Sequence, residues 1–141
     1  MKLKIFATFI AFTFYLVAMP AAHAEVIDLN HAELNEKLNE KLSEKLTTNS
    51  ELVIIDVRSA QEFATGHVPG AVNIPHDSIL RDLSVLDNYR DQDMVFYCRS
   101  GKRAASVTDA LESGNYTSGR PLYHLDGDIL GWISADQPLQ K

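Results

Sequence analysis

The chain has 141 residues, of which 13 are Lys or Arg and 19 are Asp or Glu, so its formal net charge at pH 7 is −6. This length is sufficient for one domain with one buried core, and the acidic balance disfavours binding to the phosphate backbone of nucleic acids. A single cysteine, Cys98, excludes an internal disulfide bond. Composition leaves open whether this thiol is inert and buried or reactive.

The amino terminus has the pattern of a secretory signal peptide. Lys2 and Lys4 precede the apolar run 5–18, and Ala22 and Ala24 then form a small-residue cleavage site. The run is shorter than the ~20 apolar residues of a membrane span. We therefore predict a signal peptide over residues 1–24 and one periplasmic or secreted domain over residues 25–141, with an uncleaved anchor as the alternative. We expect this domain to be a monomer that binds neither membranes nor nucleic acid.

Leucines recur every four residues at Leu34, Leu38, Leu42 and Leu46. This spacing predicts a helix over residues 33–46 with one apolar stripe, because a step of four residues advances slightly more than one helical turn. We expect the stripe to cover a sheet. A helix that binds a partner protein is the alternative.

The remaining sequence alternates short apolar runs with helical patterns. The runs predict strands at 52–57, 71–74, 94–97 and 122–125, and the stretches between them predict helices at 60–64, 78–86 and 103–111. Uninterrupted apolar runs are typical of strands that are buried on both faces of a parallel sheet. The sequence therefore predicts an α/β fold with a mainly parallel sheet and helices on both faces. In such folds, ligands bind beyond the carboxyl ends of the strands.

The candidate catalytic loop follows the run 94–97 and comprises Cys98, Arg99, Ser100, Gly101, Lys102 and Arg103. A tight loop before a helix directs backbone N–H groups inward, and together with the helix terminus it forms an anion-binding nest. Three cationic and no acidic residues lie between Met94 and Thr108. This pattern favours an ionised, nucleophilic Cys98 and an anionic substrate, and Gly101 suits a backbone with positive φ. A buried cysteine before an ordinary basic loop is the alternative.

The other histidines of the predicted domain lack the spacing of metal ligands, and we interpret them as surface or core residues. They are His31, His67, His76 and His124. The sequence thus predicts no metal site and no cofactor.

Four segments together resemble the rhodanese homology domain family. They are Val53-Ile-Ile-Asp-Val-Arg58, Glu62-Phe63, Gly66-His-Val-Pro-Gly-Ala-Val-Asn-Ile-Pro75 and the loop from Cys98 to Arg103. The resemblance extends over most of residues 30–135. It implies a five-stranded, mainly parallel sheet, and residues 26–29 are the expected fifth strand.

The resemblance also implies the activity of a sulfurtransferase of the thiosulfate type. Cys98 would attack the outer sulfur of thiosulfate, or of a polysulfide or persulfide, and carry the sulfur as a persulfide. An external thiol, cyanide or another protein would then accept it. The loop amides with Ser100 and Gly101, and the side chains of Arg99, Lys102 and Arg103, would bind the anionic donor.

Three further residues match family positions that we interpret as structural supports: Asp56, Arg58 and Glu62. We expect Arg58 and Glu62 to link the end of a strand to the following helix, with contact to the substrate as the alternative.

Two features depart from the family pattern. Asp128 replaces the second glycine of a Leu-x-Gly-Gly turn, which could place a negative charge near the rim of the pocket, although aspartate tolerates a left-handed conformation. The segment 116–122 is about three residues longer than usual, and we assign it no function.

Two alternative functions are a non-enzymatic rhodanese module for protein binding or redox and sulfur sensing, and a cysteine phosphatase or arsenate reductase. The phosphatase class has five residues between its cysteine and arginine, whereas four residues separate Cys98 from Arg103. The shorter loop suits one sulfur atom better than a phosphoryl group.

Overall fold

One sheet organises the part of the chain that the computed structural model describes, residues 24–44 and 52–141. Its strands are β1 (Val26–Leu29), β2 (Leu52–Asp56), β3 (Val72–Asn73), β4 (Asp93–Tyr97) and β5 (Leu122–Leu125). They lie in the order β1-β5-β4-β2-β3, and every pair is parallel. The five-stranded parallel sheet and the strand at 26–29 are therefore confirmed.

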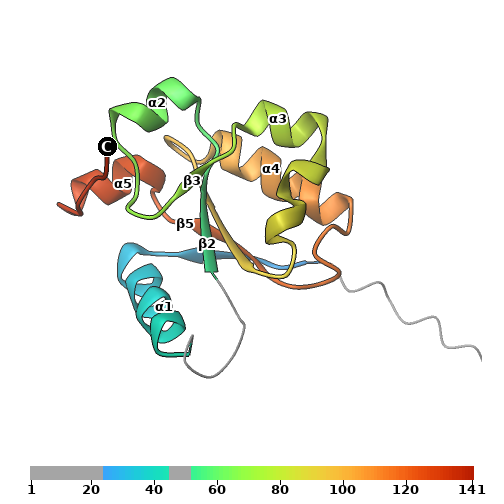
Figure 1. Ribbon diagram of the computed structural model, residues 1–141, viewed down its shortest axis with the longest axis horizontal. Coiled ribbons are helices and arrows are strands. Elements are labelled where there is room, and N and C mark those ends of the chain that lie inside the picture. Colours follow the sequence, from blue (N-terminus) through green and yellow to red (C-terminus); the bar gives the residue numbers. More distant parts are fainter. Residues whose placement is uncertain (1–23, 45–51) are drawn as a thin grey trace, which may run out of the picture.

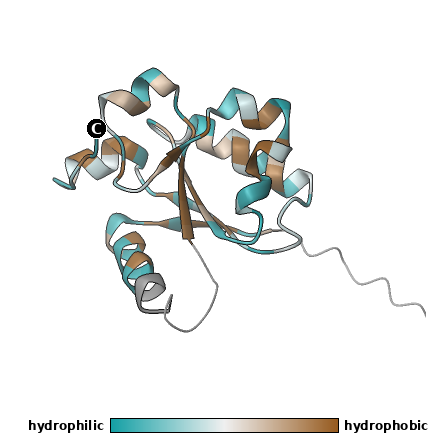
Figure 2. Ribbon diagram, in the orientation of Figure 1, coloured by the Kyte–Doolittle hydropathy of each residue, from teal (hydrophilic) through white to brown (hydrophobic). Residues whose placement is uncertain are grey.

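Helices cover both faces of this sheet (Figure 1). They are α1 (His31–Glu44), α2 (Ala60–Thr65), α3 (His76–Arg81), the 3-10 helix η1 (Leu83–Tyr89), α4 (Lys102–Ser113) and α5 (Asp128–Ser134). Side chains of α3, η1 and α4 pack on one face, and those of α1 and α5 pack on the other. Strand β2 is hydrophobic along most of its length, as Figure 2 shows.

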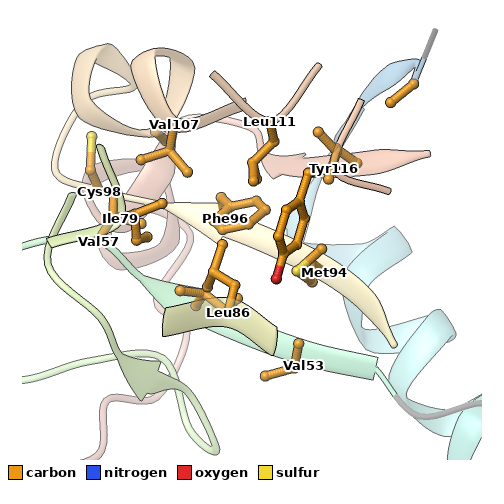
Figure 3. Packing of buried hydrophobic residues seen from close by; sticks show 14 residues of the cluster. Val53, Val57, Ile79, Leu86, Met94, Phe96, Cys98, Val107, Leu111 and Tyr116 are labelled. Carbon is orange, nitrogen blue, oxygen red and sulfur yellow. The ribbon is translucent and has the colours of Figure 1, made fainter. Parts of the chain in front are cut away.

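The central strand β4 contributes to both cores, because its side chains alternate between the faces. Met94 and Phe96 point into the core beneath α3 and α4, whereas Val95 and Tyr97 point into the core beneath α1 and α5. Cys98 continues the alternation and lies at the periphery of the first core (Figure 3). The two-residue alternation of side chains along β4 thus decides on which face of the sheet the thiol lies.

Helix α1 covers the sheet as the leucine repeat predicts. Asn30 caps it, since its Oδ1 accepts the N–H groups of Ala32 and Glu33 at 2.9 and 3.0 Å. Leu34 is fully buried, and Leu38 packs partly buried against the same core. Leu46 and the side chain of Leu42 lie outside the described residues, so the covering role is confirmed for the first half of the stripe.

Two predictions about helices are wrong. The single helix expected at 78–86 is divided into α3 and η1 at Asp82, which is extended (φ −154°, ψ 107°) and whose side chain accepts the N–H of Ser84. Local capping by this aspartate ends one helix and begins the next. Helix α5 was not expected, because Gly127 and Gly131 make its sequence a poor intrinsic helix former.

The expected signal peptide lies outside the described residues, except for Ala24, which is buried in the core beneath α4. Among the helices of residues 24–44 and 52–141, none has the length and apolar character needed to cross a bilayer.

Candidate active site

The loop from Cys98 to Arg103 connects β4 to α4 at the carboxyl edge of the sheet. Cys98 is 1% exposed, and its Sγ accepts the N–H of Gly101 at 3.2 Å. Arg99, Ser100 and Lys102 are exposed on the surface of the loop. The sulfur therefore receives a backbone hydrogen bond at the start of a 12-residue helix, which is the environment that stabilises a thiolate or persulfide anion.

Gly101 is required at its position for two reasons. Its φ is +94°, a conformation that residues with a Cβ rarely adopt, as the sequence predicts. A Cβ would also lie 3.2 Å from Oδ2 of Asp128 and 3.7 Å from the ring of His124. The backbone at Gly101 therefore packs directly on the side chains below the loop.

Asp128 holds the backbone of Cys98. The residue is 2% exposed, and Oδ1 accepts the N–H of Cys98 at 2.6 Å, while the N–H of Ile129 donates to the Cys98 carbonyl at 3.2 Å. Asp128 adopts φ +54° after Gly127 at φ +71°, so the left-handed turn survives the replacement of glycine. We expected this side chain near the rim of the pocket. It lies instead beneath the loop, on the N–H of Cys98.

His124 lies between two carboxylates. Its Nε2 is 3.2 Å from Oδ2 of Asp128, and its Nδ1 is 3.0 Å from Oδ1 of Asp28. The hydrogen bond with Asp128, supported by that with Asp28, raises the pKa of His124 above 6.5 although burial opposes the charge. Sequence spacing gave no indication of this chain of contacts.

Asp56 and Arg58 fix the carboxyl end of β2. Both are buried, and Arg58 donates through Nε and an Nη to the two oxygens of Asp56 at 2.6 to 3.0 Å. Burial opposes the charge of Arg58, but the hydrogen bonds and attraction from Asp56 raise its pKa. Arg58 also donates to the carbonyl of Gly66 at 2.8 Å, which ties the strand to the end of α2. The two residues therefore link the end of β2 to the end of α2.

Glu62 pairs with Arg103, and the predicted contact between Arg58 and Glu62 is wrong. Both Nη groups of Arg103 donate to the Glu62 carboxylate, at 2.7 and 2.8 Å. Glu62 also accepts the N–H of Ser59 and completes a capping box at the start of α2. The hydrogen bonds from Arg103, which outweigh burial, lower the pKa of Glu62 to about 2.

Arg103 also interacts with the nucleophile. Its pKa is raised first by the hydrogen bonds to Glu62, against burial, and further by the charge of Cys98. Glu62 holds the guanidinium in place at the start of α4. Arg103 borders a surface pocket of about 360 Å³ between the starts of α2 and α3, which Ser59 and His76 also line.

The loop is less positively charged in the folded protein than its own sequence suggests. Glu62 and Asp128 bring two carboxylates to a segment that contains three cations and no acid of its own. Arg103 is paired, whereas Arg99 and Lys102 are exposed and form no ion pair among the described residues. These two side chains are the cations available to an anionic ligand.

The longer segment after α4 is packed against the fold. Tyr116 is 6% exposed and donates its hydroxyl to Asp87 at 2.8 Å, and Thr117 closes a turn onto the carbonyl of Arg120. Asn115 and Ser118 adopt positive φ in this turn. Tyr116 belongs to the core beneath α3 and α4, so the segment is anchored to that core.

Two curated relatives are similar over much of the domain. YtwF of Bacillus subtilis, which carries a provisional sulfurtransferase name, is 32% identical over 114 residues, covering 81% of this chain and 97% of that protein. A transcriptional regulator of the helix-turn-helix type from Mycobacterium tuberculosis, Rv0324, is 35% identical over 91 residues. This alignment covers 64% of this chain, which spans only 38% of the regulator.

The fold is also similar to a solved structure. Thiosulfate sulfurtransferase from Pseudomonas aeruginosa superimposes with a TM-score of 0.63 at 23% identity, covering 82% of this chain and 20% of that one. The family described as the Rhodanese-like domain matches residues 33–135. With the parallel sheet and the cysteine loop in place, this match identifies the chain as a member of the rhodanese-like domain family.

Proposed function

We propose that the protein is a sulfurtransferase that carries a sulfane sulfur on Cys98. The observation that carries the proposal is the loop geometry: the buried Sγ accepts the N–H of Gly101 at the start of α4, and the exposed cations Arg99 and Lys102 belong to the same loop. The similarity to YtwF, which aligns over nearly its whole length, supports the same activity. Thiosulfate is the donor we propose first, and polysulfides and persulfides are chemically equivalent sources.

In the first half-reaction, the Cys98 thiolate attacks the outer sulfur of thiosulfate. A bond forms between Sγ and that sulfur, the sulfur–sulfur bond of thiosulfate breaks, and sulfite leaves with the bonding electron pair. The product is a Cys98 persulfide. Its terminal anion would be stabilised by the N–H groups of the loop and of the first turn of α4, which have no acceptor within the helix.

In the second half-reaction, an external nucleophile takes the terminal sulfur and regenerates the Cys98 thiolate. Cyanide yields thiocyanate, and a thiolate yields a new persulfide. Because the chain has only one cysteine, no resolving thiol is available within it. We therefore propose that the acceptor is a small thiol, cyanide or another protein.

Arg99 and Lys102 have the role of attracting the donor anion. Both are exposed beside the buried thiol and have no acidic partner among the described residues. Arg103 differs, because its two Nη groups are used by Glu62. We propose that Arg103 stabilises the bound sulfur as a fixed charge, whereas the two exposed cations increase the local concentration of donor.

A non-enzymatic module for binding or sensing is the second candidate. It is favoured by the match to Rv0324, a transcriptional regulator in which the matched segment is a minor part of the chain. The exposed cations and the hydrogen-bonded thiol favour the enzyme. Turnover separates the two.

The test measures sulfite release and thiocyanate formation with thiosulfate and cyanide. We expect turnover by the wild type and none by Cys98→Ser. The double variant Arg99→Ala/Lys102→Ala should raise the KM for thiosulfate several-fold and weaken its dependence on salt. The matched control Arg81→Ala/Arg90→Ala removes two exposed cations elsewhere and should leave both unchanged. Absence of turnover with every sulfur donor would favour the sensing module.

A further inference from the structure

A chain of three polar side chains reaches the nucleophile from beneath. Asp28 on β1 and His124 on β5 are paired positions of adjacent strands, and their side chains are 3.0 Å apart. His124 then contacts Asp128 at 3.2 Å, and Asp128 accepts the N–H of Cys98 at 2.6 Å. The chain therefore begins at the edge strand and ends on the backbone of Cys98.

The geometry fixes the protonation state of His124. Both of its ring nitrogens face carboxylate oxygens, which in the ionised state only accept hydrogen bonds. When both carboxylates are ionised, each nitrogen must carry a proton, and the ring is then an imidazolium. The raised pKa of His124, caused first by the hydrogen bond with Asp128, agrees with this assignment.

The buried carboxylate of Asp128 requires this cation. Its side chain is 3% exposed, and an uncompensated charge in such a position is strongly unfavourable. Because Oδ1 is bonded to the N–H of Cys98 itself, the carboxylate also lies within a few ångströms of the sulfur. An uncompensated negative charge there would oppose the thiolate and the persulfide.

Among the described residues, no other titratable side chain forms a hydrogen bond with His124. β1 contributes Asp28, α5 contributes Asp128, and the adjacent position on β4 is Phe96. The loop contributes the backbone of Gly101, where a Cβ would meet the imidazole. The ring is therefore packed between two carboxylates and the catalytic loop.

We propose that Asp128 and His124 are positioning residues that tune Cys98: Asp128 holds the Cys98 backbone, and protonated His124 cancels the charge that Asp128 brings beneath the sulfur. The inference rests on the proposed role of Cys98 as the sulfur carrier. It predicts that the reactivity of the thiol depends on the protonation of His124. Since the pKa of His124 is raised on folding, the imidazolium is present at and below pH 6.5 and is lost as the pH rises through the higher, folded value.

The test measures the rate of iodoacetamide alkylation of Cys98 against pH. His124→Gln keeps an amide that can donate to Asp128 but removes the positive charge, and it should raise the midpoint of the profile by about one pH unit. Asp128→Asn keeps an oxygen for the Cys98 N–H and tolerates positive φ, and it should lower the midpoint. The double variant removes one negative and one positive charge, so its midpoint should return towards that of the wild type. His31→Gln, on α1, is the matched control and should leave the profile unchanged.

Equal midpoints in the wild type and His124→Gln would overturn the proposal, as would a midpoint in the double variant as high as in His124→Gln alone. Nitrogen NMR of the His124 ring in the wild type keeps the proposal testable if a variant does not fold. Both nitrogens should carry protons at pH 6.5, and a neutral ring there would also overturn it. Alkylation needs no sulfur transfer, so these results are independent of whether thiosulfate is turned over.

Discussion

Replacing Glu62 with glutamine isolates the ion pair that holds Arg103 beside the sulfur. Glutamine retains the shape of the side chain. It can still complete the capping box with Ser59, because glutamate and glutamine both serve at the third position of this motif. The change therefore removes the charge of the bidentate pair and leaves the start of α2 intact. Any loss of stability reports on the contact between Glu62 and Arg103.

The structure limits the size of this effect. A fall in the pKa of Glu62 from 4.5 to about 2 would equal about 3 kcal/mol without solvent screening. The two side chains are 28% and 34% exposed, and exposed ion pairs contribute about 0.2–1 kcal/mol. Their bidentate geometry, at 2.7 and 2.8 Å, places this pair at the upper end. We expect Glu62→Gln to lower the free energy of unfolding by about 1 kcal/mol at pH 7.

The pH dependence of the unfolding free energy distinguishes the loss of this ion pair from a general destabilisation of the fold. Since the pKa of Glu62 is lowered in the folded state, its contribution is complete above pH 4.5 and decreases as the pH falls towards 2. The difference between wild type and variant in urea unfolding should therefore shrink over that interval. Asp77→Asn is the control, because its pair with Arg81 is 3.9 Å long and largely exposed and should contribute less than about 0.5 kcal/mol. Equal stability of Glu62→Gln and wild type at pH 7, or a difference that does not change down to pH 2.5, would refute the reasoning.

Three further predictions concern the support of the sheet, the reaction class and the amino terminus. Arg58→Met leaves the carboxylate of Asp56 buried without its partner and should cost about 3–5 kcal/mol in urea unfolding, and a loss below about 1 kcal/mol would contradict the supporting role. The wild type should hydrolyse an aryl phosphate more slowly than it transfers sulfur from thiosulfate, because four residues separate Cys98 from Arg103; the opposite order would favour the phosphatase class. Expression of the full chain in a Gram-negative host should give a periplasmic protein that begins at Glu25, and retention of residues 1–24 in a membrane fraction would exclude the predicted signal peptide.

The elements that depend on local sequence were predictable. The apolar run of β4 identifies the central strand and places Cys98 at its carboxyl end, and Gly101 has the positive φ that its place in the loop requires. The leucines of α1 likewise indicate which face packs on the sheet. In each case the deciding interaction is within one element or between an element and the core.

The contacts beneath and beside the loop could not be predicted, because they join residues that are distant in the sequence. Glu62 reaches Arg103 across 41 positions, and Asp128 reaches Cys98 across 30. A count of charges along the loop therefore missed both carboxylates. The expected partner of Glu62 was also wrong for a local reason: Arg58 precedes α2 and is directed to Asp56, two residues before it, while Glu62 faces the start of α4.

The central claim is that Cys98 accepts and releases a single sulfur atom, and intact-mass measurement tests it most directly. After exposure to thiosulfate or polysulfide, the wild type should gain the mass of one sulfur atom, and cyanide should remove it. Cys98→Ser, which keeps the size of the side chain but lacks the thiol, should gain nothing. Addition of sulfur to the serine variant, or no addition to the wild type with any sulfur donor, would contradict the account.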